Sequence, residues 1–88
     1  MKSYKYHYDS GHGWVQVPRK ELVELNILDK ITGCSYQRGL QVFLEEDCDA
    51  TTFVNAYLEK HGSVPVWIEL NNGNRSPIRY YDNFRAEV

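Results

Sequence analysis

Strict alternation near the start of the sequence is the feature that most constrains the fold of this chain. In residues 3–9, "SYKYHYD", tyrosine stands at every second position and polar or charged residues stand between. The segment "WVQVP", residues 14–18, alternates again and places Val15 and Val17 on one face. Between the two segments, "SGHG" supplies two glycines, which are free to adopt positive φ angles in a turn. We therefore predict a β-hairpin whose strands are each buried on one face.

The next segment changes from alternation to helical spacing. Pro18 suits the first turn of a helix, and the apolar residues that follow predict a short amphipathic helix over residues 18–25. Asn26 is expected to end this helix in the left-handed conformation. The sequence "TGCSYQRG", residues 32–39, is typical of a turn, and "LQVFLEE", residues 40–46, predicts a strand.

The second half of the chain predicts one longer helix and two further strands. A helix over residues 50–61 carries an apolar stripe, and Gly62 is its natural stop. The sequence "VPVWIEL", residues 64–70, predicts a strand that Pro65 confines to an edge or an irregular start. The sequence "SPIRYY", residues 76–81, follows the tight-turn signal "NNGN" and predicts a last strand that pairs back.

Together these elements predict a small α+β domain in the order β-β-α-β-α-β-β, with two short helices and an antiparallel or mixed sheet. The 88 residues leave too little core for two domains, so we expect a single domain over residues 1–88. The strands that begin at Ser3 and Ser76 are expected to be exposed edges. A homodimer formed by sheet extension is therefore one expected assembly.

Charge and composition exclude some classes of function. The net charge of −2 argues against a general nucleic-acid binder, although it is compatible with a local basic patch. No segment approaches the roughly 18 apolar residues of a membrane span. No apolar leader follows Met1, so we expect a cytoplasmic protein with no membrane partner. Cys34 and Cys48 are then expected to be free thiols, and one disulfide between them is the alternative.

The acidic stretch "LEEDCDATTF", residues 44–53, holds four carboxylates, those of Glu45, Glu46, Asp47 and Asp49. The favoured interpretation is a helix start at which Asp47 or Asp49 caps the first turn. The second interpretation is an acidic edge that steers and docks a basic partner. A metal site is not expected, because the stretch lacks the glycine-bearing loop of a calcium site.

Histidine and cysteine spacing does not favour catalysis or zinc binding. His7, His12, His61 and the two cysteines show neither C-x₂-C nor H-x₃-H pairing. A cysteine–histidine nucleophile pair would also need a third, orienting group, and the sequence offers none. We therefore expect no enzyme, no catalytic residue, no metal and no cofactor.

Two further segments supply the remaining candidate binding residues. In "GHGW", His12 is expected to be exposed, and Trp14 either anchors a partner or packs in the core behind a hairpin turn. In "SYQRG", Tyr36 and Arg38 either contact a base or a carboxylate or belong to a solvated turn. The full set of predicted binding residues is His12, Trp14, Tyr36, Arg38, Glu45, Glu46 and Asp47.

The string "GWVQVPRKELVELNI" resembles the strand, the proline-basic start and the short leucine-rich helix of swapped-hairpin AbrB-type transcription factors. The resemblance covers about residues 13–31 and implies an intertwined dimer that binds DNA through basic residues. Arg19, Lys20 and Lys30 are the matching positions. A small DNA-binding transcriptional regulator, with Arg19, Lys20 and Arg38 on phosphates, is accordingly the alternative function.

The pattern "GHGW…VP…SYQRG…LEEDCD…SPIR" resembles small uncharacterised proteins carried by phages, prophages and plasmids, over nearly the whole chain. Such proteins often act by binding a host protein, and some block a defence system. The resemblance implies a non-enzymatic protein-interaction module, an inhibitor or modulator whose partner is a host or phage protein. In that role, tyrosines, Trp14 or Trp67, and the acidic edge would contact the partner.

Overall fold

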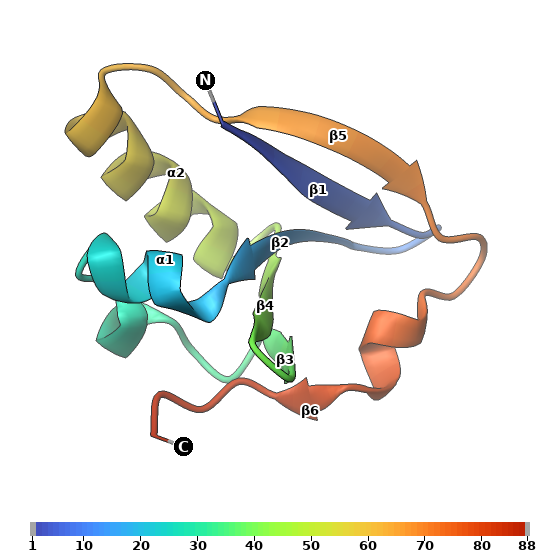
Figure 1. The fold of residues 1–88 in the computed structure, drawn as a ribbon. Helices are drawn as coiled ribbons and strands as arrows, with labels where there is room; N and C mark the ends of the chain where they lie inside the picture. Colours follow the sequence, from blue (N-terminus) through green and yellow to red (C-terminus); the bar gives the residue numbers. More distant parts are fainter. Residues whose placement is uncertain (1, 88) are drawn as a thin grey trace.

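A mixed sheet of six strands forms the centre of the computed structural model, which describes residues 2–87 (Figure 1). The strands are β1 (Ser3–Tyr8), β2 (Gly13–Pro18), β3 (Tyr36–Arg38), β4 (Gln41–Glu45), β5 (Val66–Asn71) and β6 (Asp82–Asn83). They lie in the order β5-β1-β2-β4-β3-β6. β1 and β5 are parallel, and the other neighbouring pairs are antiparallel.

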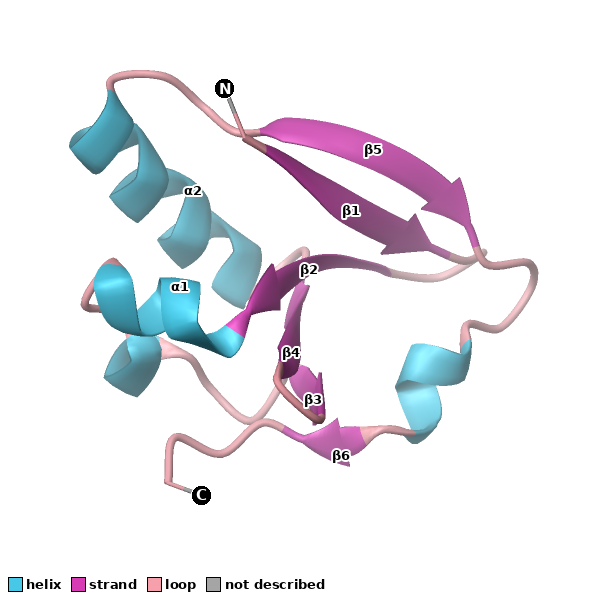
Figure 2. Ribbon diagram, viewed as in Figure 1, coloured by secondary structure: helices cyan, strands magenta, loops and turns pink. Residues whose placement is uncertain are grey.

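Helices lie on both sides of this sheet. α1 (Arg19–Glu24) and α2 (Asp49–His61) lie on one side, and the short 3₁₀ helix η2 (Pro77–Tyr80) lies on the other (Figure 1 and Figure 2). A 3₁₀ turn, η1 (Leu28–Lys30), follows α1. For residues 2–87 the predicted α+β class with a mixed sheet is confirmed. No helix in this range has both the length and the apolar character to cross a bilayer.

The main core fills the space between the sheet and the two α-helices. Val15 and Val17 of β2 and Leu44 of β4 form one buried cluster with Leu22 of α1 and Phe53 of α2. The alternation of β2 places both valines on one face, as predicted, and the two α-helices cover that face. Burial of these apolar side chains is the main favourable contribution to the fold.

A second, smaller core lies on the opposite face of the sheet. Trp14 of β2, Phe43 of β4 and Ile78 of η2 form it, and Tyr36 and Tyr81 pack against it. The helix η2 therefore covers the β2–β4–β3 part of this face.

Both predicted helix ends occur where the backbone turns left-handed. Asn26, with a φ angle of 61°, follows α1, and Gly62, with a φ angle of 77°, ends α2. Pro18 directly precedes the first residue of α1. These three positions were predictable because each depends only on local backbone preference.

Two strand predictions are wrong. Part of the expected turn 32–39 forms the strand β3. Two strands, β3 and β4, therefore separate α1 from α2 along the sequence, where one was predicted. Residues 76–81 contain η2 rather than a strand, because Pro77 begins the helix and Ser76 Oγ caps it by accepting a hydrogen bond from Ile78 N at 3.2 Å. The last strand is instead the short β6, which pairs with β3.

The edges of the described sheet are β5 and β6. The expected edges at Ser3 and Ser76 are wrong, because the strand from Ser3 lies between β5 and β2, and Ser76 precedes η2. The edge character predicted for the β5 segment is confirmed. In β5, Trp67 packs against the main core, whereas Val66 and Ile68 are 42% and 48% exposed.

A disulfide joins Cys34 and Cys48, so the expectation of two free thiols is wrong. The bond connects the loop before β3 to the residue before α2, across a sequence separation of 14. Both cysteines are exposed to solvent. The sequence spacing allowed this bond but could not decide whether it forms, because proximity in space depends on the whole fold.

Candidate functional site

Two loops far apart in the sequence meet at one end of the β2–β4 pair. Glu46 N donates a hydrogen bond to Gly13 O at 3.0 Å, and Trp14 lies opposite Glu45 in the register. His12, just before β2, therefore lies beside the acidic stretch, and its Nδ1 is 3.0 Å from Glu45 Oε2. The structure thus brings together four of the predicted binding residues, which we call the His12 cluster: His12, Glu45, Glu46 and Asp47.

A hydrogen bond from Tyr6 fixes one carboxylate of the His12 cluster. Tyr6 Oη donates to Glu46 Oε2 at 2.5 Å. Burial and this bond raise the pKa of Tyr6, so the phenol keeps its proton well above neutral pH. Gly13 permits the contact, because a Cβ at this position would lie 2.7 Å from Glu46 Oε2 and would overlap the Tyr6 ring. Gly13 does not use the freedom of glycine to adopt a positive φ angle, and the close approach of Tyr6 and Glu46 explains the glycine at this position.

Asp49 has a structural role that the sequence did not indicate. α2 begins at Asp49 with Cys48 as its N-cap, and within residues 2–87 no side chain makes a cap hydrogen bond there. The predicted capping by Asp47 or Asp49 is therefore wrong, although the helix start is placed to within one residue. The buried Asp49 carboxylate instead accepts hydrogen bonds from Ser35 Oγ at 2.5 Å and from Thr32 Oγ1 at 3.0 Å.

A row of stacked aromatic rings adjoins the His12 cluster. The Tyr6 ring stacks on those of Tyr8 and Trp67, with centroid distances of 6.3 Å and interplanar angles of 25° and 27°. All three side chains are half-buried, so part of each remains accessible. The parallel register of β1 and β5 also places Glu69 opposite Tyr6. We call Tyr6, Tyr8 and Trp67 the aromatic shelf.

Two hollows on this surface share Tyr6 and Glu46. One, of about 320 Å³, lies among the two tyrosines of the aromatic shelf, His12, Glu46 and Glu69. The other, of about 450 Å³, is lined mainly by apolar side chains, and Trp67 forms one of its walls. An acidic hollow therefore lies directly beside an apolar one.

Asp9 also lines the acidic hollow, but its charge is balanced by Arg79. Arg79 Nε and Nη2 donate to the Asp9 carboxylate at 2.6 and 2.8 Å. These hydrogen bonds hold the pKa of Asp9 well below its usual value. The negative character of the hollow therefore comes from Glu46 and Glu69.

The His12 cluster has the donor atoms of a metal site. One ligand atom from each of its residues lies within 4.8 Å of the others. One imidazole and three carboxylates are ligands that divalent cations take. Acidic groups commonly gather without an ion, and Glu45 and Glu46 already contact His12 and Tyr6, so the grouping does not by itself indicate a metal site. Sequence spacing did not predict this set, because His12 and Glu45 are far apart in the chain. Cys34, Cys48 and Asp49 are equally close together, but the disulfide prevents the sulfurs from acting as thiolate ligands.

The other predicted binding residues lie elsewhere. Trp14 is 1% exposed and packs against Ile78, so it belongs to the core and is not a surface anchor. Tyr36 is half-buried against the same core, and the Arg38 guanidinium lies 5.0 Å from the Tyr81 ring centroid. Both residues belong to β3, and neither is among the described residues that line the two hollows of the aromatic shelf.

The basic residues of the alternative function include one with an internal role. Arg19 Nη2 donates to the backbone oxygens of Arg85, at 2.8 Å, and of Ala86. Its guanidinium also lies 5.2 Å from the centroid of the Phe84 ring. Arg19 therefore holds the carboxy-terminal segment in place, while Lys20 and Lys30 are exposed.

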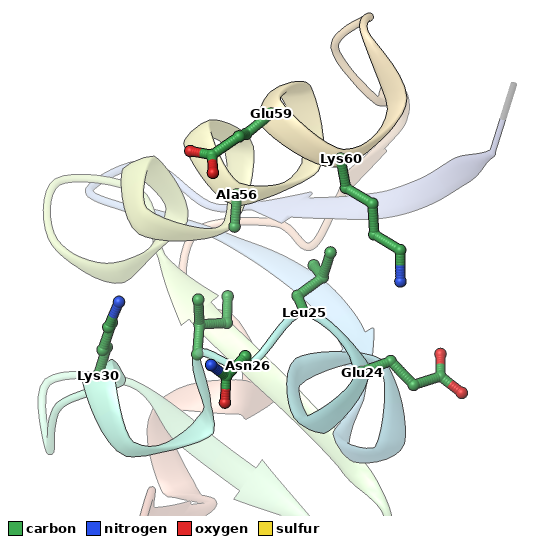
Figure 3. A pocket seen from close by; sticks show the side chains of 8 residues that line it. Glu24, Leu25, Asn26, Lys30, Ala56, Glu59 and Lys60 are labelled. Atoms are coloured by element: carbon green, nitrogen blue, oxygen red, sulfur yellow. The ribbon is translucent and has the colours of Figure 1, made fainter.

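A separate hollow of about 440 Å³ lies between α1 and α2 (Figure 3). Leu25 and Ala56 lie between charged side chains of both signs, which belong to Glu24, Lys30, Glu59 and Lys60. Because two lysines oppose two glutamates, this hollow favours neither a cationic nor an anionic ligand. It is a weaker candidate than the acidic hollow.

The sequence predicted that tyrosines and Trp14 or Trp67 would contact a partner, but it did not single out Tyr6 and Tyr8 among the tyrosines and did not indicate Glu69. The alternation of β1 indicated a half-buried tyrosine face, but the sequence did not show that β5 would pair beside it.

Comparison with protein-family models, with curated proteins and with solved structures finds no match.

Proposed function

We propose that this protein is an interaction module, without catalytic activity of its own, that binds a basic segment of another protein at the aromatic shelf. The observation that carries the proposal is the hollow in which Tyr6 and Tyr8 meet the carboxylates of Glu46 and Glu69. An arginine or lysine side chain matches this chemistry. Its charged end pairs with the carboxylates, and its stem or guanidinium plane packs on a tyrosine ring.

The adjoining apolar hollow specifies a second feature of the partner. Trp67, Val15 and Val54 line this hollow, which shares Tyr6 with the acidic one. An apolar side chain next to the basic residue would bury its surface there. Tryptophan and tyrosine are enriched among the residues that dominate interface affinity. The recognised element is accordingly a basic residue beside an apolar one.

The His12 cluster supports this proposal through its charge. Glu46 belongs to the wall of the acidic hollow, and Glu45 and Asp47 lie close to Glu46 in the His12 cluster. Clustered carboxylates attract a basic segment and raise its association rate, and salt screens this attraction beyond about 10 Å at 0.1 M. Association should therefore slow as the salt concentration rises.

The resemblance to small phage, prophage and plasmid proteins makes the proposal more specific. We propose a mobile-element inhibitor or modulator of a host protein that acts in the cytoplasm. The DNA-binding alternative has less support, because Arg19 is engaged with the carboxy-terminal backbone. The two classes are separated by capture from lysate with and without nuclease. Capture that disappears after nuclease treatment, together with salt-sensitive binding to duplex DNA, would favour the regulator.

The direct test uses short synthetic peptides that carry Arg-Leu, Lys-Leu, Glu-Leu or Ala-Leu at their centre, with affinities measured by titration calorimetry. We expect the two basic peptides to bind and the Glu-Leu peptide to bind least. The double variant Glu46→Gln/Glu69→Gln should weaken binding by about ten-fold or more, because both carboxylates of the hollow are lost.

The matched control is Glu24→Gln/Glu59→Gln, which removes the same charge beside the other hollow (Figure 3). Equal weakening by both double variants would show non-specific attraction and would contradict the proposed surface. Absence of any preference for the basic peptides would overturn the proposal itself.

A further inference from the structure

We infer that the Cys34–Cys48 disulfide is a thiol–disulfide exchange site, which low-molecular-weight thiols open and close while the domain stays folded, with Cys34 as the attacked sulfur. Both cysteines are exposed, so an incoming thiolate can reach the bond. The inference is independent of the proposed function, because it concerns the disulfide and needs no protein partner.

The position of Cys48 suits a leaving thiolate. Cys48 is the N-cap residue of the 13-residue helix α2, and within residues 2–87 no side chain makes a cap hydrogen bond at this end. A side chain at the N-cap lies beside the N–H groups of the first turn, although Cys48, with a φ angle of −130° and a ψ angle of −85°, makes no cap hydrogen bond in the disulfide form. These groups and the helix dipole favour a negative charge there, so Cys48 leaves more readily than a thiol in a loop.

The surroundings of Cys34 suit a protonated thiol. The Thr32 hydroxyl lies near both sulfurs, 2.8 Å from Cys34 Sγ and 3.4 Å from Cys48 Sγ, so it does not distinguish between them. Asp49 Oδ2 lies 3.4 Å from Cys34 Sγ. In the reduced protein, a Cys34 thiol at this distance can donate to the Asp49 carboxylate. A Cys34 thiolate would instead be repelled by it. Asp49 Oδ1 is farther from Cys48 Sγ, at 3.8 Å. After reduction, we therefore expect the thiolate on Cys48 and the protonated thiol on Cys34.

The exchange takes two steps. A thiolate attacks Cys34 Sγ and forms a mixed disulfide, while the bond to Cys48 breaks and its electron pair leaves on Cys48 Sγ. A second thiolate attacks the external sulfur of the mixed disulfide and releases the oxidised small molecule, and Cys34 takes a proton from solvent. Two electrons thus pass from two small thiols to the protein disulfide, and the reverse steps restore it.

Contacts other than the disulfide keep the loop in place after reduction. Ser35 Oγ donates to Asp49 Oδ2 at 2.5 Å and accepts from Glu45 N at 3.1 Å. Thr32 N also donates to the Asp49 carboxylate, at 3.1 Å. Hydrogen bonds to a buried carboxylate are among the stronger ones in proteins. The two sulfurs therefore stay close enough to re-form the bond.

The first experiment equilibrates the native chain in buffers of graded reduced-to-oxidised dithiothreitol ratio. Thiols are then trapped with N-ethylmaleimide and counted by intact mass, and circular dichroism is recorded in parallel. We expect two thiols to appear with native spectra, and the disulfide to return in oxidising buffer. Thiols that appear only together with unfolding, or a chain that never forms the disulfide, would overturn the inference.

The second experiment locates the attacked sulfur. The oxidised protein is treated with excess reduced glutathione, quenched with acid and mapped by peptide mass. We expect the glutathione adduct on Cys34 and a free thiol on Cys48. An adduct mainly on Cys48 would overturn the assignment. As an independent check, Cys48 in the Cys34→Ser variant should be alkylated at lower pH than Cys34 in the Cys48→Ser variant, and the opposite order would contradict it.

Discussion

Arg79 Nε lies 2.6 Å from Asp9 Oδ2, and this ion pair joins residues 70 positions apart. The same carboxylate accepts hydrogen bonds from Ser76 N at 2.7 Å and from Gly11 N at 2.9 Å. One buried aspartate therefore ties the turn of the β1–β2 hairpin to the segment that carries η2. This contact holds η2 against the face of the sheet on which Trp14 and Ile78 are buried.

Replacing Asp9 by asparagine should lower the melting temperature at neutral pH. The asparagine keeps the size of the side chain but loses the charge and one acceptor oxygen of the bidentate pair. Asp82→Asn is the control, because Asp82 is exposed in β6 and its replacement should change stability by no more than about 0.5 kcal/mol. Thermal unfolding followed by circular dichroism checks this. Equal melting temperatures for the two variants would contradict the role of Asp9.

The Asp9 pair should also make the protein less stable in acid. Because the pKa of Asp9 is lowered in the folded state, its contribution is fully present above the ordinary aspartate pKa of about 4. The contribution is lost as the pH falls below that value, because the unfolded chain then binds the extra proton. Denaturant titrations between neutral and acidic pH should show a smaller loss for Asp9→Asn than for the unsubstituted chain. Parallel pH dependences in the two proteins would be inconsistent with this account.

Replacing Gly13 by alanine should destabilise the domain by about 2 kcal/mol, the usual effect of inserting a methyl group into a packed site. The new Cβ would meet the Tyr6 ring and Glu46 Oε2, and it would separate the two groups that hydrogen-bond there. Gly33→Ala is the control, since a Cβ at Gly33 meets nothing within 4 Å among the described residues. Urea unfolding measures both. A Gly13→Ala variant as stable as Gly33→Ala would show that the close approach does not exist in solution.

Alkaline pH should destabilise the fold through two tyrosines. Burial raises the pKa of Tyr4 and Tyr6, and hydrogen bonds to Glu21 and Glu46 raise them further. Their contribution is present below the ordinary tyrosine pKa of about 10 and is lost as the pH rises above it. Absorbance titration should show tyrosines that ionise at higher pH than an ordinary tyrosine, and one of these should be absent in Tyr6→Phe. An unchanged titration curve in that variant would refute the assignment to Tyr6.

Ile78→Ala should cost about 2–5 kcal/mol of unfolding free energy, whereas Tyr80→Ala should be nearly neutral. Ile78 is 2% exposed and packs in the second core, and Tyr80 in the same helix is 72% exposed. Guanidinium unfolding of both variants makes the comparison. A larger loss of unfolding free energy for Tyr80→Ala than for Ile78→Ala would contradict the packing of Ile78 in the second core.

Elements that depend on local preference were the ones that the sequence predicted. The hairpin of β1 and β2 was predictable because alternation is read along a single strand, and Asn26 and Gly62 because each marks a left-handed helix end. The segment around Ile78 was mistaken for a strand. Its short apolar pattern suits either structure, and the capping of a 3₁₀ helix by Ser76 decides between them.

The candidate site was only partly predictable, because its parts come from distant segments. Glu45 and His12 were each singled out, but their contact depends on the pairing of β2 with β4. Tyr6 and Trp67 stack only because β1 and β5 pair in parallel, a contact that no local pattern encodes. In β5, Trp67 faces the core whereas Ile68 faces solvent. An edge strand need not bury its more aliphatic face.

The place of β1 inside the sheet has a consequence for how the chain reaches its native state. β1 precedes the other strands within residues 2–87, yet one of its two neighbours is β5, which ends at Asn71. A growing chain can form the hairpin early, but one edge of β1 stays unpaired until residues 66–71 have been made. Contacts between such distant segments slow folding, because loop closure must precede them. We therefore expect the pairing of β5 with β1 to be a late step in folding, after the β1–β2 hairpin has formed.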